Sequence, residues 1–299
     1  MNFSLEHCCL CPRQCGRNRA AGEKGVCGVA GTQVLLGRAA LHFWEEPCIS
    51  GTRGSGAVFF AGCPLHCVYC QNEELSRARV GRAVTQQRLT EIFLELQAQG
   101  AHNINLVTPT HYLLQLIPAL RAAKEQGLTV PVVYNTGGYE RPEALALLRG
   151  LVDVYLPDFK YPDREGALRY SAAPDYPQVA AEAIRCMAEQ TGPPVFDAQG
   201  LLLRGTIIRH LVLPDRTAET MRLLDELHDT YGDGVILSLM SQYTPMPACP
   251  CEELRRPVPP EQYERLVRYA RRIGISRAYV QQGEAASAGF IPAFDGTGV

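Results

Sequence analysis

The sequence predicts an α/β fold, a partial (β/α)6 barrel of the TIM type that follows a cysteine-rich N-terminal extension. Two observations support this prediction. Short apolar runs alternate with amphipathic stretches from residue 57 to residue 273, a pattern typical of parallel strands joined by right-handed helical crossovers. Polar residues follow most of the apolar runs, and barrels of this type carry their chemistry at the carboxyl ends of their strands.

The individual elements are predicted from the apolar runs and the turn formers that bound them. The helix over residues 85–99 begins with Thr85 as N-cap and ends before Gly100. Strands are expected at residues 57–60, 104–107, 130–134, 152–156, 205–213 and 235–239, and a run at 278–281 is expected to close or cover a sheet edge. Helices are expected at residues 85–99, 111–126, 142–148, 176–189, 218–229 and 260–273.

A loop with three cysteines follows the first predicted strand. Cys63, Cys67 and Cys70 have the spacing C-x3-C-x2-C. Three thiolates on one loop can ligate three irons of a [4Fe–4S] cube, and no fourth cysteine follows at ferredoxin spacing, so one iron would lack a protein ligand. An open metal position indicates chemistry rather than scaffolding. The alternatives are a structural zinc, for which His66 is the nearby fourth ligand, or a group of reduced thiols.

The string G-C-P-L-x-C-x-Y-C-x-N, from Gly62 to Asn72, resembles the cluster loop of radical S-adenosylmethionine (SAM) enzymes. It is similar to the activating enzymes of glycyl-radical enzymes such as pyruvate formate-lyase. The resemblance implies a partial barrel of the radical SAM type, with a [4Fe–4S] cluster and SAM as cofactors. It also implies that the cluster cleaves SAM to a 5′-deoxyadenosyl radical, which abstracts hydrogen, and that a flavodoxin or ferredoxin supplies the electron.

Activation of a glycyl-radical enzyme is the function that this resemblance implies. Two alternatives stay open from the sequence. The first keeps the radical chemistry but acts on a small molecule, a peptide or RNA. The second is a non-catalytic iron–sulfur or zinc protein, which would not bind SAM.

Candidate site residues lie at the ends of the predicted strands. The resemblance places Asn135, Thr136 and Gly137 at a SAM-contacting strand end. It likens Asp158-Phe159-Lys160 and Arg209-His210 to positions that hold SAM and the substrate backbone, although Asp158 and Lys160 could instead form a structural ion pair. The expected catalytic residues are Cys63, Cys67, Cys70, Asp158, Lys160 and His210, and the expected cofactor-binding residues are Tyr69, Asn105, Thr108, Asn135, Thr136 and Gly137.

The N-terminal segment holds a second group of cysteines among many glycines. Cys8, Cys11, Cys15 and Cys27 have the spacing C-x2-C-x3-C-x11-C, which suits a closed four-thiolate site for zinc or a second iron–sulfur cluster. Cys9 could replace Cys8, and free thiols on a disordered arm are the alternative. Residues 1–50 are expected to form this element and a hairpin (33–36 with 39–43), and residues 51–299 the barrel with a C-terminal extension.

Composition excludes several classes of protein. The 299 residues carry a formal net charge of −2, which argues against a general nucleic-acid or membrane-surface partner. The sequence shows no run of about 18 apolar residues and no signal-peptide pattern. Twelve cysteines without a secretory signal indicate metal ligands in a reducing compartment, so a cytoplasmic location is expected.

Overall fold

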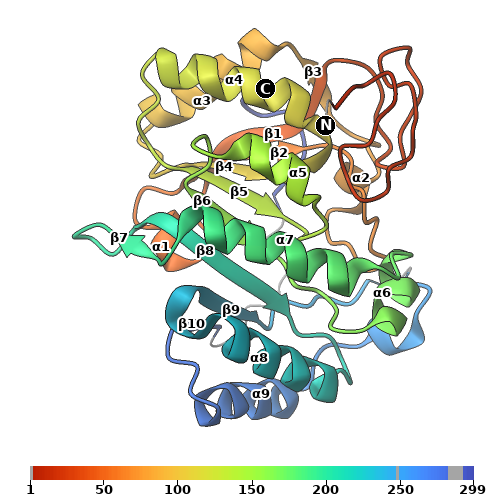
Figure 1. Cartoon of the computed structure of the whole chain (residues 1–299), viewed down its shortest axis with the longest axis vertical. Helices are drawn as coiled ribbons and strands as arrows, with labels where there is room; N and C mark the ends of the chain where they lie inside the picture. The colour runs from red at the N-terminus through yellow and green to blue at the C-terminus, as the bar shows by residue number, and fades with distance from the viewer. Residues whose placement is uncertain (1–2, 247–248, 282–291) are drawn as a thin grey trace.

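A mixed sheet forms the centre of the computed structural model, which describes residues 3–246, 249–281 and 292–299 (Figure 1). Its strands are β1 (Val34–His42), β2 (Ser55–Phe60), β3 (Arg82–Val84), β4 (Ile104–Val107), β5 (Val132–Thr136), β6 (Val154–Pro157), β7 (Val195–Phe196), β8 (Leu202–Leu211), β9 (Ile236–Met240) and β10 (Ala278–Val280). Their order is β10-β9-β8-β6-β5-β4-β2-β1-β3, with β7 beside β8.

The six predicted parallel strands are confirmed. They are β2, β4, β5, β6, β8 and β9, each hydrogen-bonded to the next, and β10 adds a seventh parallel strand at the edge beside β9. Within the described residues no ladder joins β10 to β3, so the barrel is partial. All the carboxyl ends of the parallel strands therefore meet at one edge, where the loops that follow them gather.

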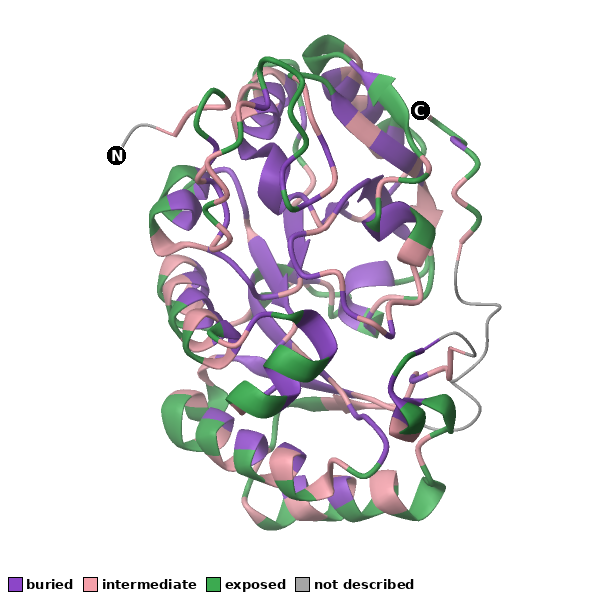
Figure 2. Cartoon of the chain, turned by 90° about the vertical axis from the view of Figure 1, so that its right-hand side faces the viewer, coloured by how far each residue is buried: buried purple, intermediate pink, exposed green. Residues whose placement is uncertain are grey.

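Helices cover the sheet. They are α1 (Pro47–Ser50), α2 (Glu73–Ser76), α3 (Gln86–Ala98), α4 (Leu113–Glu125), α5 (Pro142–Leu145), α6 (Arg164–Ser171), α7 (Tyr176–Thr191), α8 (Thr217–Tyr231) and α9 (Pro260–Arg272). The hydroxyl of Thr85 accepts a hydrogen bond from the Arg88 backbone N–H, which confirms Thr85 as the N-cap of α3. The parallel strands at the centre of the sheet are largely buried, whereas β3, β7 and β10 are partly or fully exposed, and the longer helices expose their outer faces (Figure 2).

The prediction of a hairpin at residues 33–43, before β2, is wrong. Residues 34–42 form the single strand β1, which pairs antiparallel with β2 and β3 and has a register shift between Leu36 and Arg38. Gly37 lies inside this strand rather than in a turn, and glycine suits the position because a Cβ atom there would lie 2.5 Å from Leu75. β1 and β2 thus share one sheet across the predicted domain boundary at residue 50, and the boundary itself stays a prediction.

The N-terminal segment, residues 3–33, contains no helix or strand, yet it packs onto the barrel. Leu10 and Val29 are buried in the same apolar cluster as residues of β1, β4 and α4. Figure 1 draws this segment in red beside α2. It is therefore an ordered part of the core rather than a loose arm. Among the described helices, none combines the length and apolar composition of a membrane span.

Candidate active site

The three-cysteine loop follows directly from β2. Its first turn requires a glycine, because Gly62 has φ +90° and a Cβ atom there would lie 2.7 Å from the Cys27 carbonyl oxygen. The Cys63 N–H donates to that same carbonyl at 3.1 Å, and the Cys70 N–H donates to the Cys67 carbonyl at 3.1 Å. These bonds fix the loop backbone from which the three thiols project.

All three thiols line one cavity of about 290 Å³ at the carboxyl ends of the strands. The cavity also brings together seven other predicted residues, namely Tyr69, Thr108, Asn135, Thr136, Gly137, Asp158 and Lys160. Thr108 has φ +60°, an uncommon backbone conformation for a residue other than glycine, and such conformations cluster at functional sites. The predicted ring of polar strand ends thus surrounds the cysteine loop.

The donor set suits a cluster better than a single ion. Among the described residues, no group of three or more His, Cys, Asp or Glu side chains is close enough to hold one metal ion. Thiolates of a cube each bind a different iron and therefore stand wider apart. His66, the fourth ligand that zinc would require, has its Nε2 2.8 Å from the Val26 carbonyl oxygen and its Nδ1 2.9 Å from Arg77. Both ring nitrogens are occupied, so the residues fit a [4Fe–4S] cluster with one open iron.

Ser171 contributes a hydrogen bond to this loop that the sequence did not reveal. Its hydroxyl donates to the Cys67 sulfur at 3.1 Å from the end of α6. Partners of this kind orient metal ligands and tune the metal. Helix α6 was missed because its sequence has no apolar stripe, although Asp163 caps it by accepting from the Gly166 N–H. A capping signature was the one signal that could have found it.

A buried charge network stands beside the loop. Arg209 donates to Asp158 Oδ1 at 3.0 Å, to Glu45 Oε2 at 3.1 Å and to Asn135 Oδ1 at 2.7 Å. Lys160 Nζ donates to Asp158 Oδ2 at 2.6 Å. Burial alone would raise the pKa of Asp158, but Lys160 and Arg209 outweigh it and hold that pKa below its ordinary value. Two cations therefore face two hydrogen-bonded carboxylates, and the buried Glu46 also lies within electrostatic range of Arg209.

Glu45 is the main residue that sequence reasoning missed. Its Oε1 accepts from Asn105 Nδ2 at 2.9 Å and from Asn135 Nδ2 at 3.2 Å. Nothing in its local sequence marks it, because its partners come from β4, β5 and β8. Asn105 is fully buried and does not line the cavity, so the structure places this predicted cofactor contact behind the cavity wall, in contact with Glu45.

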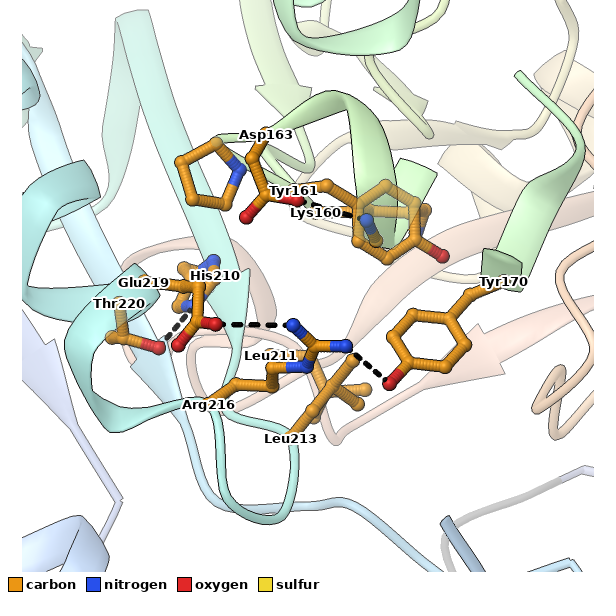
Figure 3. Close-up of a pocket in the computed structure, with 12 residues that line it drawn as sticks. Lys160, Tyr161, Asp163, Tyr170, His210, Leu211, Leu213, Arg216, Glu219 and Thr220 are labelled. Carbon is orange, nitrogen blue, oxygen red and sulfur yellow. Dashed lines mark hydrogen bonds and ion pairs between the residues drawn. The ribbon is translucent and has the colours of Figure 1, made fainter. Parts of the chain in front are cut away.

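His210 does not face the cluster cavity. Its neighbour Arg209 lines that cavity, whereas His210 lines a separate pocket of about 20 Å³ on the other side of β8 (Figure 3). His210 Nδ1 lies 2.7 Å from the Phe159 carbonyl oxygen and Nε2 lies 3.0 Å from the Thr220 hydroxyl. Burial lowers the pKa of His210 to about 4. It is therefore a neutral, internally bonded side chain, and Arg209 takes the position expected for it.

Glu140 supports the Thr136 strand end and gives a pH-dependent prediction. Thr110 and Thr136 both donate to its Oε1, and Oε2 has no partner. Burial raises the pKa of Glu140 to about 7, from 4.5. A raised pKa means that the folded state holds the proton more tightly, so the free energy of unfolding falls as pH rises from about 4.5 to about 7.

Glu140→Gln is expected to remove this fall, which amounts to as much as about 3 kcal/mol. Urea unfolding at about pH 5 and about pH 8 measures it. The exposed neighbour Glu143 provides the control, since Glu143→Gln should leave the difference between the two pH values unchanged. A Glu140→Gln protein that loses as much stability as the wild type over this range would contradict the prediction.

Known proteins resemble this chain at several levels. The profile of the Radical SAM superfamily matches residues 57–227. Uncharacterized protein MJ0674 of Methanocaldococcus jannaschii is 26% identical over 249 residues, 81% of this chain and 67% of that protein. The pyruvate formate-lyase-activating enzyme of Clostridium pasteurianum is 32% identical over 139 residues, 44% of this chain and 56% of that enzyme.

A solved radical SAM methyltransferase from Sphaerobacter thermophilus superposes with a TM-score of 0.51 at 17% identity. The superposition covers 78% of this chain and 69% of that one. At this level of identity the likeness shows the fold and does not extend to the reaction.

Proposed function

We propose that this chain abstracts a hydrogen atom from a glycine of a partner enzyme. The proposal starts from the fact that the chain belongs to the radical SAM superfamily. The observation that carries the proposal is the cavity onto which Cys63, Cys67 and Cys70 open, ringed by polar strand ends. Members of this superfamily bind a [4Fe–4S] cluster and SAM, which together supply a 5′-deoxyadenosyl radical. The chain's own residues must bind, orient and shield these groups.

The residues that would hold the cofactors form two groups, one for the cluster and one for SAM. Cys63, Cys67 and Cys70 would bind the cluster as thiolates. Lys160 lies within electrostatic range of Cys67, so its ammonium would offset negative charge at the cluster. Thr108, Asn135 and the backbone at Gly137 are the cavity-lining groups that would contact SAM. At Gly137 a Cβ atom would come within 2.9 Å of Leu65, so glycine keeps this wall open.

A polypeptide substrate is supported by the mouth of the cavity. Trp44 lines the cavity and is 58% exposed, and the adjacent Phe43 is 50% exposed. Exposed aromatic side chains of this size favour contact with another protein. The partial match to a pyruvate formate-lyase-activating enzyme points in the same direction. We propose a flavodoxin or ferredoxin as the electron donor and a cytoplasmic location.

The test is hydrogen transfer between defined molecules. The protein is reconstituted anaerobically with iron and sulfide, reduced with dithionite and incubated with SAM and a candidate glycyl-radical enzyme that carries deuterated glycine. Deuterium in the released 5′-deoxyadenosine supports the proposal. If 5′-deoxyadenosine is released but carries no deuterium with any of these partner enzymes, glycine is not the hydrogen donor. The radical cleavage of SAM would still stand. No release from a protein with an intact cluster would overturn both.

A further inference from the structure

Four cysteines outside the active site converge in the N-terminal segment. Cys11 is within electrostatic range of Cys8 and Cys27, and Cys27 is within range of Cys8 and Cys15. A Cβ atom on Gly25 would lie 3.2 Å from the Cys27 sulfur and 3.5 Å from the Cys15 sulfur, so these two sulfurs meet across one glycine. As at the cluster loop, the described residues include no group of three or more His, Cys, Asp or Glu side chains placed to hold a single metal ion.

Arg19 is an independent sign that this group carries negative charge. Its side chain is fully buried, and its Nη1 donates to the His111 carbonyl oxygen at 2.6 Å and lies 3.7 Å from the Cys8 sulfur. Its Nε and Nη2 atoms have no hydrogen-bond partner. None of the ion pairs in the described part of the chain includes it. A buried cation without a counter-charge is strongly unfavourable.

We propose that Cys8, Cys11, Cys15 and Cys27 hold a second metal centre as four thiolates, and that the buried Arg19 offsets its negative charge. Because these thiols are not close enough to hold one ion, the centre they suit is a [4Fe–4S] cluster, which keeps a net negative charge when four thiolates bind it. Metal binding would displace the four thiol protons to solvent. Arg19 Nη1, which lies 3.7 Å from the Cys8 sulfur, would then face a thiolate that accepts its hydrogen bond.

The structure also chooses between Cys8 and Cys9. Cys8 is buried beside Arg19, whereas the side chain of Cys9 is only half-buried. Cys9 is held through its backbone, since its carbonyl oxygen accepts from Arg141 at 2.7 Å. Cys9 is therefore left out of the centre and provides a matched control.

The proposed centre is linked directly to the active-site loop. The Cys27 and Val26 carbonyls accept from Cys63 N–H and His66 Nε2, respectively. Arg13 donates to the Pro64 carbonyl at 2.9 Å and to the carbonyls of Ser171 and Ala172 at 2.8 and 2.6 Å. Residues 3–33 contain no helix or strand, so a metal would add a further constraint, beside their turns and buried side chains, on the backbone that makes these bonds. Loss of this metal is expected to lower cluster occupancy at Cys63, Cys67 and Cys70.

The first experiment measures the N-terminal centre alone. The active-site ligands are removed together in Cys63→Ala/Cys67→Ala/Cys70→Ala, and this protein is loaded anaerobically with zinc or with iron and sulfide. We expect an iron–sulfur absorption band after loading with iron and sulfide, and retention of zinc without such a band would overturn a cluster here. Adding Cys15→Ser should abolish binding, whereas adding Cys9→Ser should not. Equal metal contents in the Cys15→Ser and Cys9→Ser proteins, with unchanged circular dichroism, would overturn the proposal.

The second experiment tests the counter-charge. Arg19→Met in the same background is expected to weaken metal retention about 10- to 100-fold, the usual effect of losing an outer-shell partner. Arg19→Lys should restore part of this retention, and Arg17→Met, at an exposed neighbouring arginine, should have no effect. If Arg19→Met holds the metal as tightly as Arg17→Met, the role of Arg19 is refuted. Neither experiment uses SAM, so a negative result in either can be distinguished from failure of the proposed function, on which this inference does not depend.

Discussion

Cys67→Ala is expected to abolish the release of 5′-deoxyadenosine from the reconstituted, reduced protein. Cys67 is buried, lines the cavity and accepts the hydrogen bond from Ser171. Without it, two thiolates would remain for a cube that needs three from this loop. Losing a ligand itself should cost more than the roughly 100-fold that losing an outer-shell partner can cost. Chromatography of the nucleoside product measures the effect.

The control for this variant is another cysteine of the same chain. Cys186 lies on α7, partly buried and away from the cavity, so Cys186→Ala should keep wild-type product release. Product release is a better measure than iron content, because the N-terminal cysteines could retain iron of their own. Undiminished release from Cys67→Ala would mean that the active cluster is bound elsewhere in the chain.

The strands and the cysteine loop could be predicted because their signals are local. The strand expected at residues 104–107 is β4 with the same bounds, since a short apolar run is bounded there by polar residues and a turn. The loop from Gly62 to Asn72 carries its chemistry in the spacing of three cysteines. Such features require no knowledge of which residues meet in space.

The face on which a side chain lies could not be predicted in the same way. Successive residues of a strand point to opposite faces, so Arg209 and His210 cannot both enter the cavity. Resemblance placed both at the site, but only the register of β8 against β6 and β9 decides that Arg209 points inward. Glu45 escaped notice for a related reason, because its role comes from contacts with three strands distant in sequence.

Arg209→Met is expected to lower the free energy of unfolding by about 3–5 kcal/mol, the usual effect of removing one partner from a buried ion pair. Arg209 joins Glu45, Asp158 and Asn135, and its side chain is only 15% exposed. Its loss would leave two carboxylates with Lys160 as the remaining cation of the network. Urea unfolding measures the loss. Arg204→Met, at an exposed arginine on the same strand, should change stability by less than about 0.5 kcal/mol.

The free energy of unfolding measured at acid pH shows whether Arg209→Met acts through lost charge or through lost packing. In the wild type the depressed pKa of Asp158 contributes stability above its ordinary pKa of 3.8, and this is lost as pH falls through the lower folded value. Without Arg209 the pKa of Asp158 should move back up toward its ordinary value, so the stability that Asp158 loses in acid should become smaller. Adding Asp158→Asn should remove what remains of this acid-dependent loss. The double change should also cost less than the sum of the single changes, because the two residues interact directly. If Arg209→Met loses as much stability in acid as the wild type, and the losses in the double variant are strictly additive, Arg209 acts by packing alone. The charge network would then not be what holds the polar strand ends around the cluster loop.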